Sequence, residues 1–505
     1  MITLERLCAP FPELAAAVAG LPPERRAVPV TGVAVDSRRC RPGHLFVAVP
    51  GTRDDGWRFV PQAVAAGAAA VVAGRGAPGG LSVPLLRVTD PRPWPARLAR
   101  EWQGRPDESL RLAGVTGTNG KTTTATLLRH LLARRHGDAG LLGTIRYVTG
   151  RRDEPAPLTT PDGPTLYGLL AEMVAAGLPA AAMEVSSHAL DQERTADLAL
   201  DVAVMTNLGR DHLDYHRTPA AYAAAKARIR ELLAGERRRK APGALVVNAD
   251  EPAFAALTAP AGETVRFGTD PAARPDLLLA DAVLDRDGSR LVLRWRGRSL
   301  AVRTRLVGRF NALNVLAAAA AMLAMGEPFD AVVEGLATAP QVPGRLEVLP
   351  LPGGATAVVD YAHTPDALAA VLAACREWTS GRLHVVFGAG GDRDRGKRPL
   401  MGEVAARLAD VAWITSDNPR TEPPEAIIAE IVAGHRAALP PGAPPCRVEP
   451  DRRTAITAAL ADAAPGDTVV VAGKGHEDYQ IVGDRRLDLD DRRIVRDWIR
   501  EVSRA

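Results

Sequence analysis

The stretch AGVTGTNGKTTT, residues 113–124, decides the fold of this chain. The apolar run LRLAGVTG leads into a glycine-rich loop, and the pattern after Lys121 is typical of a helix as far as about Arg135. In such a strand–loop–helix unit, backbone amides and the helix N-terminus bind phosphate, Lys121 reaches the outer phosphates and Thr122 holds magnesium. The common pattern has Gly where this chain has Val115. We predict that the loop binds ATP, the alternative being a glycine-rich turn that arose by chance.

Strand-like runs follow this loop and alternate with helical patterns. PAAAMEVSS, LDVAVMTNL and GALVVNAD are apolar runs that end in polar residues, which predicts a largely parallel sheet covered by helices. Beyond about residue 350 the chain starts again with LHVVFGAGG, DVAWITSD and DTVVVAGKG. Ligands of doubly wound sheets bind at the carboxyl ends of the strands, so we expect the loops after these three runs to share one site.

The length of 505 residues exceeds what one hydrophobic core supports and suggests roughly three domains. The segment PRPWPARLAREWQGRP, rich in Pro and Trp, is typical of a connection out of the first of them. We therefore expect an α/β protein with domains at residues 1–105, 106–340 and 341–505.

Composition limits the classes of protein that the chain can belong to. Hydrophobic residues make up 46% and charged residues 24%, and no apolar run approaches the length of a membrane span. The start, MITLERLCAPFPELAAAV, has acidic residues and Pro where a signal peptide needs a basic end and an unbroken apolar stretch. Four scattered cysteines show no disulfide or zinc pattern. We expect a cytoplasmic protein without a membrane span, and a monomer by default.

The charge pattern gives no sign of a nucleic-acid partner. Lys and Arg number 63 against 59 Asp and Glu, and the basic runs are short. One of them, RRRK at residues 237–240, we interpret as a solvated helix end.

Two further residues suit a phosphate site. Glu184 closes the run MEVSS, and His212 follows TNLGRD. A carboxylate and an imidazole at strand ends are suitable magnesium ligands, although histidine is less typical than carboxylate. Either residue, taken alone, could equally be structural.

The chain resembles the Mur ligases in a series of motifs that occur in the order of that family. The resemblance covers nearly the whole chain and is weakest in the first hundred residues. The motifs are GTNGKTTT, MEVSSHALDQERT, TNLGRDHLDYH, GRFNALN, VPGRLE, DYAHTPDAL, GAGGDRDRGKRP, SDNPRTE and AGKGHEDYQ.

The resemblance implies an N-terminal domain that holds a uridine nucleotide, a central ATPase domain with a P-loop and a C-terminal Rossmann-like domain that holds an amino acid. It implies an ATP- and magnesium-dependent ligase that joins meso-diaminopimelate to UDP-N-acetylmuramoyl-L-alanyl-D-glutamate in peptidoglycan precursor synthesis. ATP phosphorylates the D-glutamyl side-chain carboxylate, and the diaminopimelate amine attacks the acyl phosphate. Magnesium and Lys121 neutralise the charge repulsion between carboxylate and triphosphate.

The same resemblance assigns roles to residues of the central domain. Lys226 lies in AAYAAAKARI, where a lysine is ordinarily a solvated helix former. By resemblance it is carbamylated, which creates an anionic oxygen ligand for a second magnesium. The implied catalytic residues are Lys121, Lys226, His212 and Glu184, and the metal ligands are Thr122, Glu184, His212 and Lys226 as its carbamate. The implied ATP-binding residues are Gly117, Thr118, Asn119, Gly120, Lys121, Thr122, Thr123, Asn311, Arg345 and Asp360.

Two substrate sites are implied in the same way. Leu158 stands where relatives often have Asn, a departure that affects one substrate hydrogen bond. Arg420 suits the distal carboxylate of diaminopimelate and Glu477 its distal ammonium, whereas the alternative for Arg420 is a turn cap after Pro419. The implied contacts of the uridine substrate are Val35, Ser37, Thr52, Arg53, Asp54, Thr159, Thr160, Ser186, Gln192 and Arg194. Those of diaminopimelate are Arg398, Asp417, Asn418, Pro419, Arg420, Gly473 and Glu477.

Three other functions stay open on the sequence. The same ligase could use L-lysine, and folylpolyglutamate synthetase shares the implied fold and chemistry, although SDNPR and GKGHEDYQ favour the Mur group. From a different class, a P-loop ATPase could act as a switch or motor. A motor would hydrolyse ATP without an acceptor and an amino acid, which a ligase would not.

Overall fold

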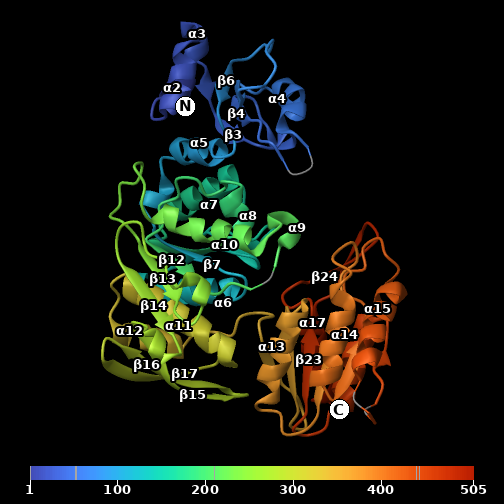
Figure 1. The fold of residues 1–505 in the computed structure, drawn as a ribbon. Coiled ribbons are helices and arrows are strands. Elements are labelled where there is room, and N and C mark those ends of the chain that lie inside the picture. The colour runs from blue at the N-terminus through green and yellow to red at the C-terminus, as the bar shows by residue number, and fades with distance from the viewer. Residues whose placement is uncertain (1, 52–53, 210, 440, 443, 505) are drawn as a thin grey trace. The chain divides into compact units, whose positions relative to one another are not determined.

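The computed structural model describes residues 2–51, 54–209, 211–439, 441–442 and 444–504 (Figure 1). The chain forms two compact units. The first unit contains Met1–Ala280, Leu293–Leu300 and Leu313–Leu336, and the second contains Asp281–Val292, Ala301–Ala312 and Ala337–Ala505.

The N-terminal part of the first unit is built on a parallel four-stranded sheet. Its strands are β3 (Gly32–Ala34), β4 (His44–Val47), β5 (Ala70–Gly74) and β6 (Leu85–Val88). A short pair, β1 (Ile2–Thr3) and β2 (Pro29–Val30), lies beside it in sequence. The helices of this part are α1 (Leu4–Cys8), α2 (Pro12–Ala19), α3 (Pro23–Arg26), α4 (Val60–Ala65) and α5 (Trp94–Trp102).

The central sheet is mainly parallel, as the sequence predicts. It carries the phosphate loop, residues 117–123, which the sequence predicts to bind ATP. Its parallel strands, in spatial order, are β8 (Ala139–Leu142), β11 (Ala180–Glu184), β7 (Arg111–Thr116), β12 (Val202–Met205), β13 (Ala244–Asn248) and β14 (Thr264–Gly268). Two antiparallel strands form one edge, β9 (Arg146–Val148) and β10 (Asp153–Pro155). The sheet continues beyond β14 into β15 (Leu277–Asp285), β16 (Gly288–Trp295) and β17 (Arg298–Thr304), which have parts in both units.

Helices connect and cover these strands. Every residue of β11 and β12 is buried, and so is every residue of β7 except Arg111. Because both faces of these strands are covered, their sequences are apolar throughout and do not alternate between apolar and polar residues. The helix predicted from Lys121 is confirmed as α6 (Lys121–His136), which packs on β7, β8 and β11. The other helices of this region are α7 (Gly163–Ala175), α8 (Ser187–Asp191), α9 (Leu213–His216), α10 (Pro219–Ala227), α11 (Arg309–Ala324) and α12 (Phe329–Ala337).

The second unit contains a six-stranded sheet of the doubly wound kind. β18 (Glu347–Pro350) is antiparallel to its neighbour, and the other strands are parallel. They follow β18 in the spatial order β19 (Thr356–Asp360), β23 (Thr468–Ala472), β20 (Leu383–Phe387), β21 (Val411–Ile414) and β22 (Arg447–Val448). The helices are α13 (Pro365–Arg376), α14 (Lys397–Leu408), α15 (Pro424–Ala438), α16 (Arg452–Asp462) and α17 (Asp491–Val502), and a hairpin is formed by β24 (Tyr479–Val482) and β25 (Arg485–Asp488).

Glycines let two of these helices approach closely. A Cβ atom on Gly402 of α14 would lie 2.1 Å from the Ile431 carbonyl oxygen, and one on Gly434 of α15 would lie 2.0 Å from that of Pro399. Both positions therefore exclude side chains. In Figure 1, α13 and α14 lie beside β23 and α15 lies next to α14, as expected for helices that cover a parallel sheet.

The predicted α/β class is confirmed, and each predicted domain contains one main sheet. The strands β3–β6 fall within 1–105, the central sheet within 106–340 and the six-stranded sheet within 341–505. The domain boundaries themselves stay a prediction.

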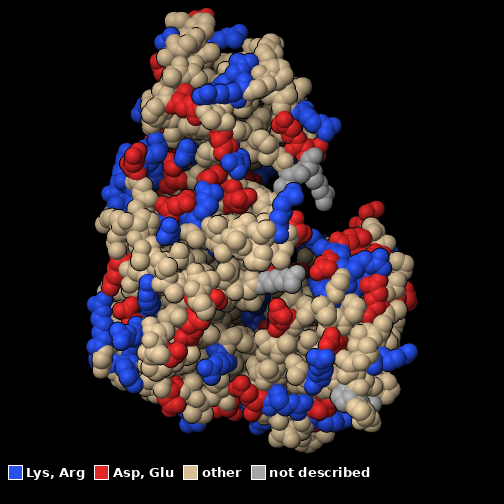
Figure 2. All heavy atoms as spheres, viewed as in Figure 1, with Lys and Arg blue, Asp and Glu red and all other residues tan. Residues whose placement is uncertain are grey.

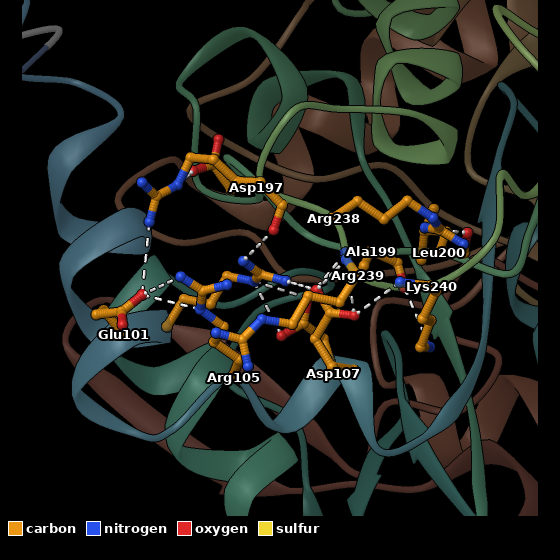
Figure 3. A network of polar contacts seen from close by, with 12 residues as sticks. Glu101, Arg105, Asp107, Asp197, Ala199, Leu200, Arg238, Arg239 and Lys240 are labelled. Atoms are coloured by element: carbon orange, nitrogen blue, oxygen red, sulfur yellow. Dashed lines mark hydrogen bonds and ion pairs between the residues drawn. The ribbon is translucent and has the colours of Figure 1, made fainter. Parts of the chain in front are cut away.

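The interpretation of residues 237–240 as a solvated helix end is wrong. The run follows the last helical turn and ties loops of the first unit together (Figure 3). Arg238 donates to the Leu200 carbonyl at 2.9 Å, and Lys240 pairs with Asp201 at 2.7 Å and also donates to the Leu110 carbonyl. The side chains of Arg238 and Lys240 are only 6% and 14% exposed, because they satisfy backbone carbonyls around the starts of β7 and β12.

Both signs of charge are interspersed over the face shown in Figure 2. No helix within the described residues has the length and apolar character that crossing a membrane requires.

Candidate active site

The phosphate loop lies between β7 and α6 in the first unit and depends on two glycines. Gly117 and Gly120 have φ angles of 149° and 83°. A Cβ on Gly117 would lie 1.9 Å from Thr206 Oγ1, and one on Gly120 would lie 2.3 Å from Asn314 Oδ1. The loop can therefore follow this path only with glycine at both positions.

The loop is tied to the end of the neighbouring strand β12. The backbone amide of Asn119 donates to Asn207 Oδ1 at 2.9 Å, and the hydroxyl of Thr206 donates to the carbonyl of Asn119 at 2.6 Å. The hydroxyl of Thr118 accepts from the amide of Gly209 at 2.8 Å. These bonds fix the loop at the carboxyl edge of the sheet before any ligand binds, which favours a preorganised anion site.

Two lysine side chains meet at one carbonyl oxygen of the loop. Lys121 Nζ donates to the Gly117 carbonyl at 2.8 Å, and Lys226 Nζ, from α10, donates to the same oxygen at 2.7 Å. Lys226 is buried. Burial, and next the charge of Lys121, lower the pKa of Lys226 to about 6. At neutral pH the amine of Lys226 is therefore mostly uncharged, which relieves its repulsion from Lys121.

Glu184, at the end of β11, faces the start of α6. Its carboxylate accepts from the Thr122 hydroxyl at 3.0 Å, from the Thr144 amide at 2.7 Å and from the Thr144 hydroxyl at 3.0 Å. A Cβ on Gly143 would lie 2.6 Å from Glu184 Oε1, so the close approach requires glycine. The side chain of Glu184 is buried, and Thr144 fixes its direction.

His212 lies in a cluster of aromatic rings beside α10. It has a φ of 52° and precedes α9, where its ring contacts His188 at 4.7 Å and Tyr222 at 6.2 Å between centroids. The His212 side chain is 45% exposed, and its partial burial, followed by Lys121 and Lys226, lowers the pKa of His212. Burial and the neighbouring His212 lower the pKa of His188 to about 4. Both imidazoles are therefore neutral at pH 7, the state in which a histidine can bind a metal.

The predicted metal ligands can be compared with magnesium chemistry. Thr122 and Glu184 offer a hydroxyl and a carboxylate in contact, and hard oxygen donors of this kind suit magnesium. Among the residues that the structure describes, no group of three His, Cys, Asp or Glu side chains forms a metal site by itself. Only two of the four predicted magnesium ligands, Glu184 and His212, belong to these residue types. The other two ligands are the hydroxyl of Thr122 and a carbamate on Lys226.

The residues predicted to bind the uridine substrate fall into two groups of the first unit. In one, Thr160 donates to the Glu184 carbonyl at 2.9 Å and accepts from the Ser186 amide at 3.0 Å, while Arg194 donates to the Thr160 carbonyl at 3.1 Å and to Gln192 at 2.6 Å. Thr159 joins this group through a hydroxyl contact of 3.0 Å with Thr144.

The other group lies in the N-terminal part. The buried Ser37 donates to Gln62 at 2.8 Å, Asp54 pairs with Arg58 at 2.5 Å, and Val35 is half-buried after β3. Thr52 and Arg53 lie outside the described residues. Leu158, which departs from the family pattern, is exposed, and its carbonyl accepts from the Tyr147 hydroxyl at 2.5 Å.

In the second unit, two of the residues predicted to bind ATP lie together. Asp360 is buried at the end of β19 and accepts from the Leu346 amide at 2.6 Å and the Ala362 amide at 2.8 Å. Burial raises the pKa of Asp360, although Arg345 opposes this shift. The Arg345 guanidinium lies 4.6 Å from the centre of the Tyr361 ring. Asn311, in α11, donates to the Val307 carbonyl at 3.0 Å.

The residues predicted to bind the amino acid gather at the carboxyl ends of β21 and β23. Asn418 donates to Glu477 at 3.0 Å and accepts from the Ile481 amide at 2.9 Å. A Cβ on Gly473, with φ 118°, would lie 2.9 Å from Asp417 Oδ2. The loops after these strands therefore pack against each other, as the sequence predicts for loops at one sheet edge.

Arg420 and Arg398 have different surroundings. Arg420 has a φ of 54° and exchanges backbone hydrogen bonds with the β24 hairpin, and its guanidinium donates to the Gly391 carbonyl at 2.7 Å. Arg398 is fully buried and donates to Glu422 at 2.8 Å and to Glu430 at 3.0 Å. Its charge is thus already balanced within the protein, and its predicted contact with the ligand stays a prediction.

The structure adds residues that the sequence reasoning missed. Thr144 orients Glu184, His188 flanks His212, and Lys474 lies among Asp417, Asn418 and Glu477. Thr144 lies in the run LLGTIRY and Lys474 in AGKGHEDYQ, and the second of these was singled out without a role for its lysine. For Thr144 and Lys474, position just after a strand was the local signal, because most of their partners are distant in sequence.

Comparison with known proteins gives consistent matches over the chain. Residues 29–102 match the model of the Mur ligase family catalytic domain, residues 115–322 the Mur ligase middle domain and residues 344–475 the Mur ligase glutamate ligase domain. A relative from Gloeobacter violaceus, named UDP-N-acetylmuramoyl-L-alanyl-D-glutamate--2,6-diaminopimelate ligase, is 46% identical over 93% of this chain and 94% of its own length. A relative of the same name from Geobacillus kaustophilus is 42% identical over 94% of this chain and 95% of its own length.

Solved structures agree with these matches. A structure of a UDP-N-acetylmuramoyl-L-alanyl-D-glutamate--2,6-diaminopimelate ligase has a TM-score of 0.70 and 32% identity, covering 99% of both chains. The MurF ligase of Thermotoga maritima in complex with ADP has a TM-score of 0.61 at 21% identity, covering 94% of this chain and 98% of its own, and is similar in fold.

Proposed function

Because the chain belongs to the Mur ligase family, we propose that it joins meso-diaminopimelate to UDP-N-acetylmuramoyl-L-alanyl-D-glutamate with consumption of ATP. The observation that carries the chemistry is the meeting of Lys121 and Lys226 at the Gly117 carbonyl, beside the phosphate loop. ATP and a uridine nucleotide as substrates would place the reaction in the cytoplasm, where we expect the enzyme to act as a monomer.

In the proposed reaction the phosphate loop binds the ATP phosphates through backbone amides and Lys121. The D-glutamyl carboxylate attacks the γ-phosphorus, the bond to the ADP oxygen breaks, and an acyl phosphate forms. The diaminopimelate amine then attacks the acyl carbon, loses a proton and displaces inorganic phosphate. Lys121 offsets the negative charge that otherwise keeps carboxylate and triphosphate apart.

Thr122, Glu184, His212 and a carbamate on Lys226 would hold magnesium, which supplies positive charge to the phosphate oxygens when bound. The low pKa of Lys226, about 6, supports the carbamate, since only an uncharged amine adds to carbon dioxide. The addition forms a nitrogen–carbon bond and releases one proton, so a neutral buried amine becomes an anionic oxygen ligand. Thr144 would keep the Glu184 carboxylate directed toward the same place.

The amino-acid specificity of the proposal rests on the loops of the second unit. Diaminopimelate differs from lysine by a carboxylate at its far end, for which Arg420 offers a planar, two-pronged donor. Asp417 and Glu477 carry the negative charge that the distal ammonium needs. The nearby Asn418 holds Glu477 in place at 3.0 Å.

The experiment that tests this function measures ADP release with each substrate omitted in turn. We expect ADP only when the uridine nucleotide and meso-diaminopimelate are both present, with L-lysine and L-glutamate as poor substitutes. A product whose mass exceeds the acceptor by one diaminopimelate residue confirms the amide bond. ATP hydrolysis without the uridine nucleotide and without an amino acid would favour a switch or motor instead. Use of L-lysine as efficiently as meso-diaminopimelate would refute the assigned specificity.

A further inference from the structure

Lys474 is a buried cation among the residues proposed to bind the distal end of the amino acid. It follows Gly473 at the end of β23, and its side chain is 0% exposed. Its Nζ donates to Asn418 Oδ1 at 3.2 Å and to Glu477 Oε2 at 3.3 Å, and it lies 3.7 Å from Asp417 Oδ1. One ammonium group thus contacts three residues of the proposed site.

These contacts determine how much negative charge the site presents. Burial alone would raise the pKa of the Asp417 carboxyl, but Lys474 and then Arg452 outweigh it and hold this pKa below its ordinary value. Arg452 is itself paired with Asp491 at 2.7 Å. Lys474 therefore balances about one of the two carboxylate charges of Asp417 and Glu477 within the protein, and the other is left for a ligand.

We propose that Lys474 is a specificity-determining residue, which tunes the site to an amino acid with a zwitterionic far end rather than one with a lone ammonium. This inference rests on the proposed function. The far end of meso-diaminopimelate carries an ammonium and a carboxylate, whereas that of lysine carries an ammonium alone. A site with one more negative charge attracts the lone ammonium more strongly and repels the carboxylate.

Lys474 has no exposed surface with which to contact the ligand, so it acts as a positioning residue through its carboxylate partners. The contact between a carboxylate and the distal ammonium is common to both amino acids. It therefore cancels in the ratio of their kcat/KM values, and the ratio reports the balance of charge. This readout separates a role in specificity from a role in stability, which would affect both amino acids alike.

The test is competition between equimolar meso-diaminopimelate and L-lysine, with the two products quantified by mass spectrometry. Lys474→Met removes the charge and keeps much of the side-chain volume. We expect the ratio of diaminopimelate to lysine product to fall roughly tenfold or more, with KM for the uridine nucleotide unchanged. Arg486→Met is the matched control, because Lys474 and Arg486 both lie near the Tyr479 ring, at 5.4 and 4.0 Å from its centre, but Arg486 is exposed to solvent. It should leave the ratio unchanged.

For a second variant we expect the ratio of diaminopimelate to lysine product to change in the opposite direction. Glu477→Gln removes a negative charge, so the ratio should rise even though the use of both amino acids falls. An unchanged ratio in folded Lys474→Met, or a falling ratio in Glu477→Gln, would overturn the inference. The Glu477→Gln result decides the matter if Lys474→Met does not fold. Failure of the wild-type enzyme to ligate diaminopimelate would instead refute the proposed function, which keeps the two failures distinct.

Discussion

Lys226 is held where an ammonium ion is unfavourable. Its side chain is buried and shares a carbonyl acceptor with Lys121, and the face of the Tyr222 ring, 4.4 Å away, offsets only part of this cost. The cost of charge at this place appears as the lowered pKa, about 6. Conversion to a carbamate would place an anion, in place of a neutral amine, beside the Lys121 ammonium, and the resulting ion pair explains why a lysine is compatible with this position.

The pH dependence of activation tests this explanation. Enzyme stripped of carbon dioxide should regain activity when carbon dioxide is supplied, at a rate that rises as pH increases through about 6 and levels off above it. The sign follows because protonated Lys226 predominates below that pH and cannot react. The measurement is the rate of reactivation at constant dissolved carbon dioxide.

The matching variants are Lys226→Ala and Lys121→Ala. Acetate should partly restore Lys226→Ala by supplying an oxygen ligand, but it should not restore Lys121→Ala, whose missing group is a cation. Full activity in buffer free of carbon dioxide, with no response to bicarbonate, would contradict a carbamate.

Arg420 is the second residue whose role can be measured directly. Arg420→Ala should lower kcat/KM for meso-diaminopimelate by roughly a hundredfold or more, since it removes a charge-assisted partner of a carboxylate. Arg420→Lys keeps the charge but not the two-pronged geometry, and it should recover only part of the loss. Binding of the uridine nucleotide, measured by calorimetry, serves as the control. A change of similar size in that affinity would assign Arg420 to the structure of its loop, the turn-cap alternative.

At the scale of secondary structure, strands of the central sheet are positioned by polar groups at their starts. Lys240 pairs with Asp201 at 2.7 Å, and Asp201 accepts from the Leu112 amide, also at 2.7 Å. The same lysine donates to the carbonyl of Leu110, just before β7. β7 leads directly into the phosphate loop, so this network fixes the strand that carries the site.

Lys240→Met should therefore lower the free energy of unfolding by about 1–3 kcal/mol, because it leaves buried acceptors without their donor. The measurement is urea denaturation followed by circular dichroism. Arg296→Met is the control, since Arg296 forms an exposed pair with Glu263 at 2.6 Å and should be nearly neutral. Equal stability of the two variants would show that the network contributes no more than a surface pair.

Hydrophobic pattern predicted β7, β11, β12 and β13 of the central sheet and β20, β21 and β23 of the six-stranded sheet, but neither the other strands nor the side-chain networks. The run AAAME has weak strand propensity, yet its place between a helical pattern and a polar loop identified β11 correctly. Lys240 and Lys474 contact residues far away in sequence: Leu110 lies 130 residues before Lys240, and Asn418 lies 56 residues before Lys474. Local sequence contains no record of such contacts, so RRRK was assigned to solvent.

Among the predicted functional residues, too, the features that are local in sequence could be predicted and the contacts between distant residues could not. The phosphate loop could be placed because strand, glycines and helix are adjacent in sequence. Arg398 could not be distinguished from a ligand-binding arginine, since its partners Glu422 and Glu430 lie on the loop and helix beyond the next strand. Resemblance indicated that a lysine at 226 would be functional, but its burial and lowered pKa became visible only in the fold.

For the whole molecule, each of the two units has hydrophobic clusters of its own. In the first unit, a large cluster includes Leu4 and Phe254, and a smaller one lies among β4, β5 and α4, while two clusters of the second unit lie on the six-stranded sheet. In the second unit, Arg452 of α16 and Asp491 of α17 are both 0% exposed and pair at 2.7 Å. Arg452 also donates to the carbonyls of Ser416 and Ala472, at 3.3 and 2.9 Å. The pair thus links α16 and α17 to the loops that follow β21 and β23, where the residues predicted to bind the amino acid lie.

Arg452→Met should destabilise the second unit selectively, by about 3–5 kcal/mol, because it leaves the Asp491 carboxylate buried without a partner. Because each unit has core clusters of its own, we expect the units to open separately, so amide hydrogen exchange should accelerate in α16, α17 and β23 while protection in β7 and β11 stays unchanged. Arg500→Met is the control on α17, the helix that carries Asp491, since Arg500 is exposed and pairs with Asp497 on the surface. Equal loss of protection in both units would show that the chain unfolds as one cooperative structure, and it would refute this assignment of stability to separate units.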